Sequence, residues 1–524
     1  MPKKFNITGT CIPERHYMVD ISNKLNAIME MVEQGDYFTI NRPRQYGKTT
    51  TKFLLEKELK KRDDYLAIRI SFEGIGDVVF NEEDSFIQTF ISLMKRDLKF
   101  SGHTKLATFI DKCKRCLKFE ELNSLLTDLS LDSEKKLVLL IDEVDKSSNN
   151  QLFLSFLGIL RTKYLMQNEG KDRTFHSVIL AGVHDVKTMK LKIRPDAEQK
   201  YNSPWNIAVD FKVDMSFNPA EIATMLSDYS EKTATEMDID TISKRIYHYS
   251  NGYPFLVSRI CKEIDEEILP LKKTKTWQTD DVDTGVKVIT GERNTNFESL
   301  VKNIENHSEL YRLAEDIVVG NLIHTYNALD PVINLGEIYG LFKNRSNRIV
   351  FHNKIYEEII TNYITSKLTR EKSREIAQEA VRSGFVKPND NLDIEKVLFK
   401  FQDVIREKYS KTDLLKSDEF LEKDLRLLFL VFLNPIINGI GFSFKEVETG
   451  EEKRLDIVIL FRNEKFVVEL KIWRGQEYHK KGINRLKEYM KSEGVDKGYM
   501  LIMDKGRHKE FTHEKQSGIL MVWV

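Results

Sequence analysis

Between residues 37 and 59, a short apolar run is followed by Gly-Lys-Thr and then by a helical pattern. The run reads YFTIN, and the chain continues RPRQYGKTTTKFLLEKEL. A phosphate-binding loop needs this order, because a strand must deliver backbone N–H groups to the phosphates at the start of a helix. The usual spacing GxxxxGK[ST] is met except at its first position, where Arg42 replaces glycine. The segment therefore predicts an α/β unit built around a phosphate site.

The 524 residues are too many for one core and fit roughly three domains of ~100–200 residues each. Hydrophobic residues make up 41% and charged residues 31%, which is typical of a folded, helix-rich protein. Over residues 1–217, helical patterns alternate with the apolar runs YFTIN, YLAIRISF, KLVLLID and SVILAGV. That alternation predicts an α/β fold with parallel strands and crossover helices.

The rest of the chain divides by pattern. Residues 218–273 predict a helical lid without strands, and residues 274–367 predict a small winged-helix-like domain. Residues 368–400 are charged and amphipathic, as in a helical connector. Residues 401–524 begin with helices and continue as strand, hairpin, helix and strand.

Charge and composition limit the partners. Lysine plus arginine and aspartate plus glutamate each number 81, so any nucleic-acid contact must come from a local patch. The most apolar run, LRLLFLVFLNPIINGIGF, contains Arg426, Asn434 and Pro435, and the amino terminus lacks a signal segment. We expect no membrane contact and a cytoplasmic location. Cys113 and Cys116 form a CxxC without a second pair, which favours reduced thiols over zinc.

An acidic pair follows the apolar run KLVLLID, which ends in Asp142 and is followed by Glu143. In phosphate-binding-loop enzymes an acid at such a strand end supports the magnesium shell, and a neighbouring acid can orient the attacking water. The alternative is a buried strand followed by a solvated acidic turn. We expect the two acids to complete a site for ATP and Mg²⁺.

These segments resemble the bacterial AAA-like ATPases, a family related to the signal-transduction P-loop ATPases with numerous domains (STAND). The matching pieces are YMVDISNKLNAIMEMVEQGDYFTINRPRQYGKTTT, IDEVDK, AGVHDVKTM, NSPWNIAVDF and NGYPF. RPR before GKT is usual in that family, so Arg42 is expected there.

The resemblance implies roles for residues of this P-loop NTPase fold. Lys48 and Thr49 would contact phosphate and magnesium, within a loop that includes Gly47 and Thr50. Asp142 and Glu143 would form the Walker B pair, with Asp142 in the magnesium shell and Glu143 catalytic. The resemblance also places Gly252 and Pro254 in the lid near the base. It places His184 at a sensor position, although a histidine at a strand end is commonly structural.

Near the carboxy terminus, RLDIVILFRNEKFVVELKIW reads as a hairpin of two apolar strands. With a two-residue turn at Asn463 and Glu464, Asp456 would lie opposite Lys471. Alternation along the strand puts Glu469 on the same face as Lys471. Buried carboxylates are unfavourable unless compensated, so Asp456 and Glu469 could bind magnesium while Lys471 positions the attacking water. The alternative is a structural salt bridge.

The pattern Asp456, then Glu469-x-Lys471, resembles the PD-(D/E)XK nuclease superfamily. The supporting pieces are LRLLFLVFLNPIING, VELKIWRGQEYHKKG and DKGYMLIM. The resemblance implies that the three residues are catalytic and that an acid on the preceding helix joins the metal shell. Glu422 is our choice for that acid, although a surface pair with Arg426 at i,i+4 explains it equally well.

One departure and one further pattern concern the next helix. Related nucleases often carry glutamine four residues before tyrosine, whereas here Arg485 precedes Tyr489, which puts the usual role of the glutamine in doubt. The segment KIWRGQEYHKKGINRLKEYMK is rich in lysine and arginine, with Trp473, Tyr478 and Tyr489 interleaved. It predicts a phosphate-contacting face. The alternative is a solvated helix face.

Together these patterns favour an ATP-binding, nucleotide-regulated, magnesium-dependent DNA nuclease, acting in defence against or maintenance of mobile DNA. ATP and Mg²⁺ would be its cofactors and DNA its partner, with a homo-oligomer left open. The alternative is a non-catalytic nucleotide switch whose nuclease-like domain only binds nucleic acid or protein. A motor that moves along DNA is disfavoured, because the two Walker elements are not accompanied by other helicase motifs.

Overall fold

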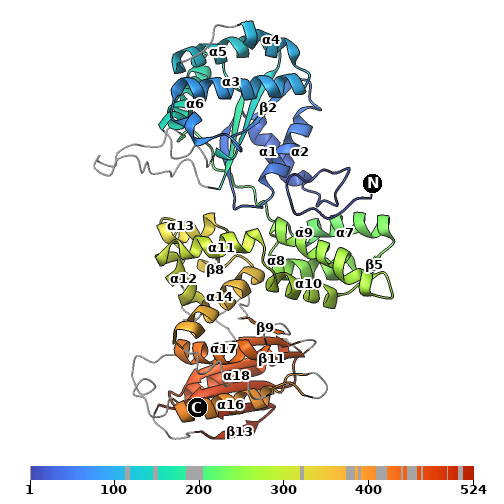
Figure 1. Ribbon diagram of the computed structural model, residues 1–524, viewed down its shortest axis with the longest axis vertical. Helices are drawn as coiled ribbons and strands as arrows, with labels where there is room; N and C mark the ends of the chain where they lie inside the picture. Colours follow the sequence, from blue (N-terminus) through green and yellow to red (C-terminus); the bar gives the residue numbers. More distant parts are fainter. Residues whose placement is uncertain are drawn as a thin grey trace, which may run out of the picture. The chain divides into compact units, whose positions relative to one another are not determined.

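The computed structural model describes residues 2–112, 118–144, 151–183, 205–318, 324–372, 384–387, 391–408, 422–437, 441–444, 457–461, 464–492, 494–505 and 511–524. These residues form two compact units (Figure 1). The first unit comprises Met1–Tyr247, Asn251–Thr279 and Glu337–Gly340. The second comprises His248–Ser250, Asp280–Gly336 and Leu341–Val524.

A parallel sheet of four strands, in the order β1-β4-β3-β2, forms the centre of the first unit. Its strands confirm the four predicted from the apolar runs: β1 (Tyr37–Asn41), β2 (Tyr65–Ser71), β3 (Lys136–Asp142) and β4 (Ser177–Gly182). The segment around Val209 continues the sheet beyond β1, since its N–H donates to the Tyr37 carbonyl at 2.8 Å. Because the strands are parallel, the carboxyl ends of β1 and β3 open at the same edge.

Helices cover this sheet. They are α1 (Ser22–Glu33), α2 (Lys48–Leu59), η1 (Asp77–Phe80), α3 (Glu83–Phe100), α4 (Thr104–Lys112), α5 (Phe119–Asp132) and α6 (Gln151–Asn168). Leu139 and Leu180 join the core formed with α3–α6, and the alternating neighbours Leu140 and Ile179 are also fully buried. Strands buried on both faces explain why the runs read as continuously apolar.

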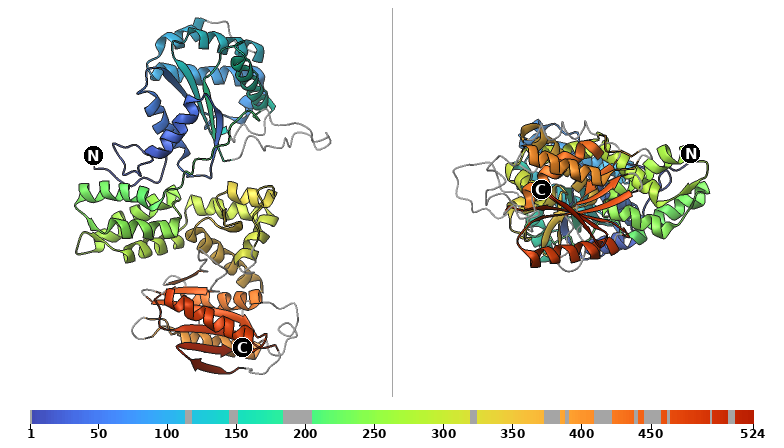
Figure 2. Two further views of the ribbon diagram at one scale, coloured as in Figure 1. Left: turned by 180° about the vertical axis from the view of Figure 1, so that it is seen from behind. Right: turned by 90° about the horizontal axis from the view of Figure 1, so that it is seen from below.

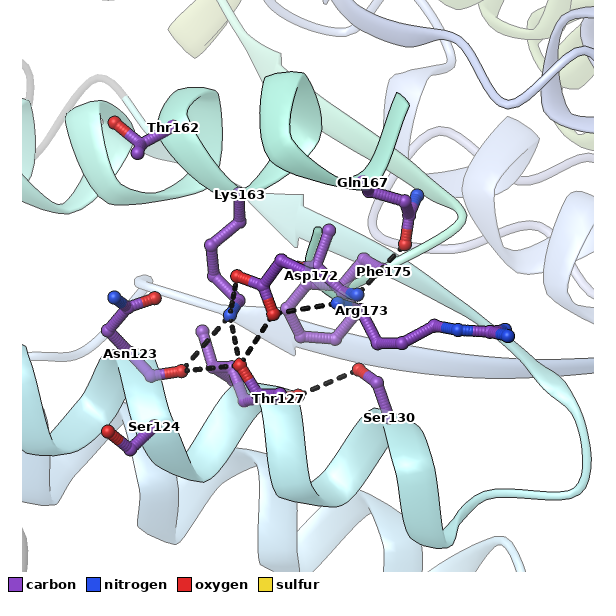
Figure 3. Close-up of polar contacts among 12 residues, drawn as sticks. Asn123, Ser124, Thr127, Ser130, Thr162, Lys163, Gln167, Asp172, Arg173 and Phe175 are labelled. Carbon is purple, nitrogen blue, oxygen red and sulfur yellow. Dashed lines mark hydrogen bonds and ion pairs between the residues drawn. The ribbon is translucent and has the colours of Figure 1, made fainter. Parts of the chain in front are cut away.

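A buried lysine joins α5, α6 and the loop before β4 (Figure 3). Lys163 Nζ donates to the Asn123 carbonyl at 3.1 Å, to the Thr127 hydroxyl at 2.6 Å and to Asp172 Oδ2 at 2.8 Å. The Thr127 hydroxyl donates to the other oxygen of Asp172 at 2.8 Å. Every ammonium hydrogen therefore has an acceptor, which offsets the unfavourable desolvation of the charge.

The lid region of the first unit is helical, with α7 (Pro219–Thr233), α8 (Ile239–Ser250), α9 (Pro254–Glu263), the π-helical η3 (Ile264–Ile268) and η4 (Leu269–Leu271). A capping box between Asn218 and Glu221, with Pro219 at the first helical position, starts α7. The prediction of a lid without strands is wrong in one detail, because β5 (Glu236–Met237) pairs in parallel with β6 (Thr276–Trp277). Two residues are too few to produce an alternating pattern in the sequence.

The second unit starts with helices and a hairpin: α10 (Thr279–Gly291), α11 (Thr295–Glu305), α12 (Ser308–Val318), α13 (Pro331–Ile338), β7 (Phe342–Arg345), β8 (Arg348–Phe351) and α14 (Lys354–Lys372). Ser346 and Asn347 make the hairpin turn with φ of 51° and 61°, as a two-residue turn matching strand twist requires. Glu358 of α14 is buried, and burial raises its pKa to about 8, opposed by a hydrogen bond with Thr290 of α10.

A six-stranded mixed sheet, in the order β13-β14-β12-β11-β10-β9, forms the carboxy-terminal part of the second unit. The elements in chain order are α16 (Ile394–Lys408), α17 (Glu422–Ile437), β9 (Gly441–Phe444), β10 (Ile457–Phe461), β11 (Glu464–Ile472), α18 (Gln476–Ser492), β12 (Gly498–Met503), β13 (His513–Gln516) and β14 (Ile519–Trp523). Strands β9, β10 and β11 are antiparallel, and α18 carries the chain to β12, which is parallel to β11. Helix α16 spans the expected boundary at residue 400.

Two hydrophobic cores flank this sheet. One contains α16 and α17 with Ile459 and Leu470, and the other contains α18 with Val458 and Val467. The right-hand view of Figure 2 shows the strands between these helices. The result is a three-layer α/β/α arrangement, so β10 and β11 are covered on both faces.

None of the helices among the described residues is both long enough and apolar enough to span a bilayer.

Candidate functional site

The phosphate-binding loop joins β1 to α2 as predicted. Gly47 precedes the helix with φ of 81°, and Gln45 also has a positive φ of 57°. Lys48 begins the helix, and its buried Nζ donates to the carbonyls of Arg42 at 2.7 Å and Pro43 at 2.8 Å. The loop therefore curls around the lysine ammonium at the amino end of α2, where backbone N–H groups and the helix dipole favour an anion.

Arg42, which replaces the first glycine of the motif, has a structural partner. Its guanidinium donates to the Val213 carbonyl at 2.7 Å and lies 5.1 Å from the ring centre of Phe211. Its own N–H donates to the Gly182 carbonyl at 3.3 Å. The side chain thus links the loop to the segment beyond β1. Burial lowers the pKa of Arg42.

Asp142 lies at the carboxyl end of β3, next to the start of α2. Its Oδ2 accepts a hydrogen bond from the Thr49 hydroxyl at 3.2 Å, and its Oδ1 accepts one from the Glu143 N–H at 2.9 Å. Lys52 forms an ion pair with Oδ1. Glu143 has a φ of 55°, an uncommon backbone conformation of the kind that clusters at functional sites.

Thr50 faces the amino-terminal segment: its hydroxyl accepts a hydrogen bond from the Cys11 N–H at 3.1 Å. The same segment reaches the lid, where the Phe5 ring lies 5.0 Å from Tyr229 and 6.2 Å from Trp277. The first twenty residues therefore connect α2 with the lid helices.

Gly252 and Pro254 lie where the lid meets the loop. Pro254 lies 3.9 Å from the position that a Cβ on Gly47 would occupy. The intervening Tyr253 donates its hydroxyl to the Arg44 carbonyl at 2.6 Å, and its ring meets Tyr46 edge-on at 4.7 Å. The NGYPF segment therefore contacts the loop directly. His184 lies outside the described residues.

The residues at this edge of the sheet fit magnesium and a nucleotide phosphate. The Thr49 hydroxyl and the Asp142 carboxylate are oxygen donors, which Mg²⁺ prefers, and they lie 3.2 Å apart beside Lys48. The sequence prediction identified these residues but missed Lys52 and Tyr253. The available signal for Lys52 was its spacing of four residues from Lys48, which puts both lysines on one face of α2.

A second cluster lies on β11 of the second unit. Glu469 and Lys471 share a face of the strand, as predicted, with Lys471 Nζ 3.0 Å from Glu469 Oε1. Glu469 is fully buried and Lys471 is 7% exposed. A charged pair this deep in an apolar sheet is unfavourable unless the charges compensate each other.

Glu422, at the start of α17, joins this cluster. Its Oε2 lies 3.7 Å from Lys471 Nζ, and its Oε1 accepts hydrogen bonds from the Tyr478 hydroxyl at 3.1 Å and the Ile472 N–H at 3.3 Å. Burial and the nearby Glu422 charge raise the pKa of Tyr478. Arg485 of α18 brings a second cation, with Nη1 3.6 Å from Glu469 Oε1.

The hairpin register differs from the prediction. Phe461 pairs with Glu464, so Glu464 is the first residue of β11 and the predicted turn at Asn463 and Glu464 is wrong. Ile457 pairs with Val468. Both strands are apolar on both faces, so the sequence lacked the alternation that normally sets register. Asp456 lies outside the described residues.

Two other expectations concern this region. Tyr489, predicted on a phosphate-contacting face, is 1% exposed and belongs to the core beneath α18. Trp473 and Tyr478 are partly exposed. Within the described part of the chain, no group of three or more His, Cys, Asp or Glu side chains is placed to hold a metal ion. The carboxylates of Glu469 and Glu422 are nonetheless oxygen donors of the kind magnesium prefers.

The strand, the loop, its helix and the acid on a neighbouring parallel strand define a P-loop nucleotide-binding fold. The chain belongs to the AAA-like domain family, whose model matches residues 13–362. Residues 392–507 match a second model, described as a domain of unknown function (DUF8371). That description names no activity. No curated protein matches this chain.

Solved structures with similar folds include the Walker-type ATPase PABY2304 of Pyrococcus abyssi, at 12% identity and a TM-score of 0.46, covering 68% of this chain and 99% of that one. The ORC2 protein of Aeropyrum pernix matches at 14% identity and a TM-score of 0.39, covering 70% and 97%. The RuvB Holliday junction branch migration motor of Thermotoga maritima matches at 14% identity and a TM-score of 0.33, covering 65% and 94%.

Proposed function

We propose that this chain is an ATP-binding, nucleotide-regulated nuclease that cleaves DNA with magnesium. The observation that carries the proposal is the buried pair of Glu469 and Lys471, joined by Glu422 from the neighbouring helix. Charged side chains at these positions do not stabilise strands at the centre of a sheet. A site that binds a cation and a phosphate, in contrast, requires charged side chains.

In the first unit, Lys48 would neutralise the nucleotide phosphates, and Gly47 with the following backbone would surround them. Thr49 and Asp142 would hold Mg²⁺, which supplies charge neutralisation at the phosphates. Glu143 would orient a water molecule. Pro254, which lies close to Gly47, and Gly252 two residues before it would respond to whether nucleotide is bound.

In the second unit, Glu469, Glu422 and Asp456 would hold the magnesium ion. Asp456 directly precedes Ile457 of β10 in the sequence, one position from the pair Ile457–Val468. Lys471 would orient the attacking water and stabilise negative charge on the phosphate. The water oxygen bonds to phosphorus and the bond between phosphorus and one ester oxygen breaks. One proton of the water ends on that oxygen as the alcohol product, and the other stays with the phosphate or passes to solvent.

The order of elements supports this assignment. Helix α17, antiparallel β9, β10 and β11, helix α18 and parallel β12 follow the sequence helix, strand, hairpin, helix, strand expected for the PD-(D/E)XK superfamily. Helices α11, α12 and α13 followed by the hairpin β7–β8 similarly support a winged-helix-like domain between lid and nuclease. DNA is the proposed partner in a cytoplasmic setting of mobile-DNA defence or maintenance.

The test is a nuclease assay on DNA and RNA of several forms, with and without ATP and magnesium. We expect magnesium-dependent cleavage of DNA that is lost in Glu469→Gln. Glu477→Gln, an exposed acid on α18, is the matched control and should cleave normally. Wild-type protein that binds ATP but cleaves none of these substrates would reject the nuclease.

A second candidate is favoured by one observation. Two cations, Lys471 and Arg485, lie within 3.6 Å of the single carboxylate Glu469, which is also the arrangement of a structural salt-bridge cluster. In that case the chain is a nucleotide switch whose carboxy-terminal domain only binds nucleic acid or protein. Titration of the wild type and of Glu469→Gln with Mn²⁺ distinguishes the two, because only the nuclease has a metal site in the second unit for the variant to lose.

A further inference from the structure

Helix α2 carries a second buried lysine beyond the one in the motif. Lys52 lies four residues after Lys48, on the same face of the helix, and is 1% exposed. Its ammonium forms an ion pair with Asp142, the acid at the end of β3. Lysine is almost never this buried without a specific partner.

This ion pair completes the environment of Asp142. One carboxylate oxygen contacts Lys52 and the Glu143 N–H, and the other accepts from the Thr49 hydroxyl. The acid expected to support magnesium therefore already has a protein cation beside it. Apolar residues in place of both members of the pair would stabilise the fold at least as well, since a buried ion pair seldom outweighs its desolvation.

We infer that Lys52 is an internal cation that neutralises Asp142 while no magnesium is bound, so that nucleotide can bind and stay bound without the metal. The inference rests on the proposed nucleotide site. In the absence of a metal, Asp142 and Glu143 would present two negative charges close to the phosphates. Lys52 offsets one of them. Magnesium, when present, supplies the same charge, so Lys52 matters less.

The test is the affinity for ADP, which is not hydrolysed, measured by calorimetry with excess EDTA and with excess Mg²⁺. In Lys52→Met we expect ADP affinity to fall about tenfold in EDTA and to stay within about threefold of wild type in Mg²⁺, the size of a local charge effect. Lys52→Arg should behave like wild type. Lys57→Met is the matched control, because Lys57 lies on the same helix, is exposed and pairs with Glu14.

A second pair of variants tests the partner directly. Lys52→Met leaves a buried carboxylate uncompensated and could fail to fold, whereas Asp142→Asn and Asp142→Asn/Lys52→Met both lack that charge. We expect ADP affinity in EDTA to be nearly equal in these two, because Asp142, the carboxylate with which Lys52 pairs, is neutral in both. The inference is wrong if the double variant binds ADP in EDTA about tenfold more weakly than Asp142→Asn does. Lys52 would then act on phosphate or on structure.

The outcomes separate the inference from the proposed function. Wild-type protein that binds neither ADP nor ATP in Mg²⁺ rejects the nucleotide site itself. Wild-type protein that binds ADP in Mg²⁺, with equal losses for Lys52→Met in EDTA and Mg²⁺, rejects only the role of Lys52.

Discussion

Lys471 Nζ lies 3.0 Å from Glu469 Oε1 on β11, and the Glu469 side chain has no exposed surface. Because this carboxylate is the buried acid of the proposed metal site, Glu469→Gln should abolish phosphodiester cleavage in Mg²⁺ or Mn²⁺. Lys471→Met should retain metal binding but lose cleavage, since its role is toward water and phosphate. Cleavage assays and Mn²⁺ calorimetry measure the two effects. Full activity of Glu469→Gln would contradict the nuclease assignment.

Lys48→Ala should abolish ATP binding. The change removes the cation that we propose neutralises the phosphates and also the two hydrogen bonds that hold the Arg42 and Pro43 carbonyls. Calorimetric titration with magnesium-ATP checks it, and the nuclease rate without nucleotide should be unaffected. Equal, weak binding by the wild type and the variant would mean that the loop is no nucleotide site.

Nucleotide state should change the nuclease rate. The lid contacts the loop through the hydrogen bond from Tyr253 to Arg44, so Tyr253→Phe should weaken the response while keeping the ring against Tyr46. Cleavage rates are compared without nucleotide, with ADP and with a non-hydrolysable ATP analogue. If all three rates agree in the wild type, nucleotide binding and DNA cleavage occur on one chain without being coupled.

Gly252→Ala should destabilise the first unit strongly. Gly252 has a φ of 71°, and an added Cβ would lie 2.0 Å from the Phe217 carbonyl oxygen. Gly170→Ala is the matched control, with a φ of 74° but no atom within 4 Å of the added Cβ. Thermal unfolding should show a loss of about 1 kcal/mol for the control, from backbone strain, and at least about 2 kcal/mol more for Gly252→Ala. Similar melting temperatures would mean that the chain relaxes around the clash.

Glu358 should make stability depend on pH. Its folded pKa of about 8 lies above the ordinary value of 4.5, so the folded state holds the proton more tightly. The resulting stabilisation is complete below the ordinary pKa of 4.5. It decreases by about 1.4 kcal/mol per pH unit as the pH rises from there to about 8, where it is lost. Glu358→Gln should lack this slope, so its unfolding free energy should change less between pH 5 and 8.5 than that of the wild type. Parallel curves for the two proteins would contradict the assignment.

Most of the fold of the first unit could be predicted because it depends on short, local sequence patterns. The four apolar runs are strands because each is buried on both faces, and Gly47-Lys48-Thr49 begins a helix where a strand-loop-helix unit needs it. The pair β5–β6 could not be predicted, since two-residue strands depend on long-range pairing and not on their own periodicity. Trp277, for example, is placed by the rings of Phe5 and Tyr229.

The sites were predictable to the extent that they depend on motif spacing. Glu469 and Lys471 share a face because they are two residues apart on a strand, and Glu422, chosen on the helix that precedes the hairpin, lies near Lys471. The register of β10 on β11 was missed because Val458, Ile459 and Val467 are apolar on either face. Lys52 was missed because its partner, Asp142, lies on strand β3, far along the chain from helix α2.

Arg42 has a consequence for how relatives can be recognised. Its guanidinium occupies a place defined by the Val213 carbonyl and the Phe211 ring, so the residue and that distant segment should have changed together in evolution. A motif search that insists on glycine at this position would discard such chains. A search that accepts arginine when a later aromatic residue accompanies it would recover them.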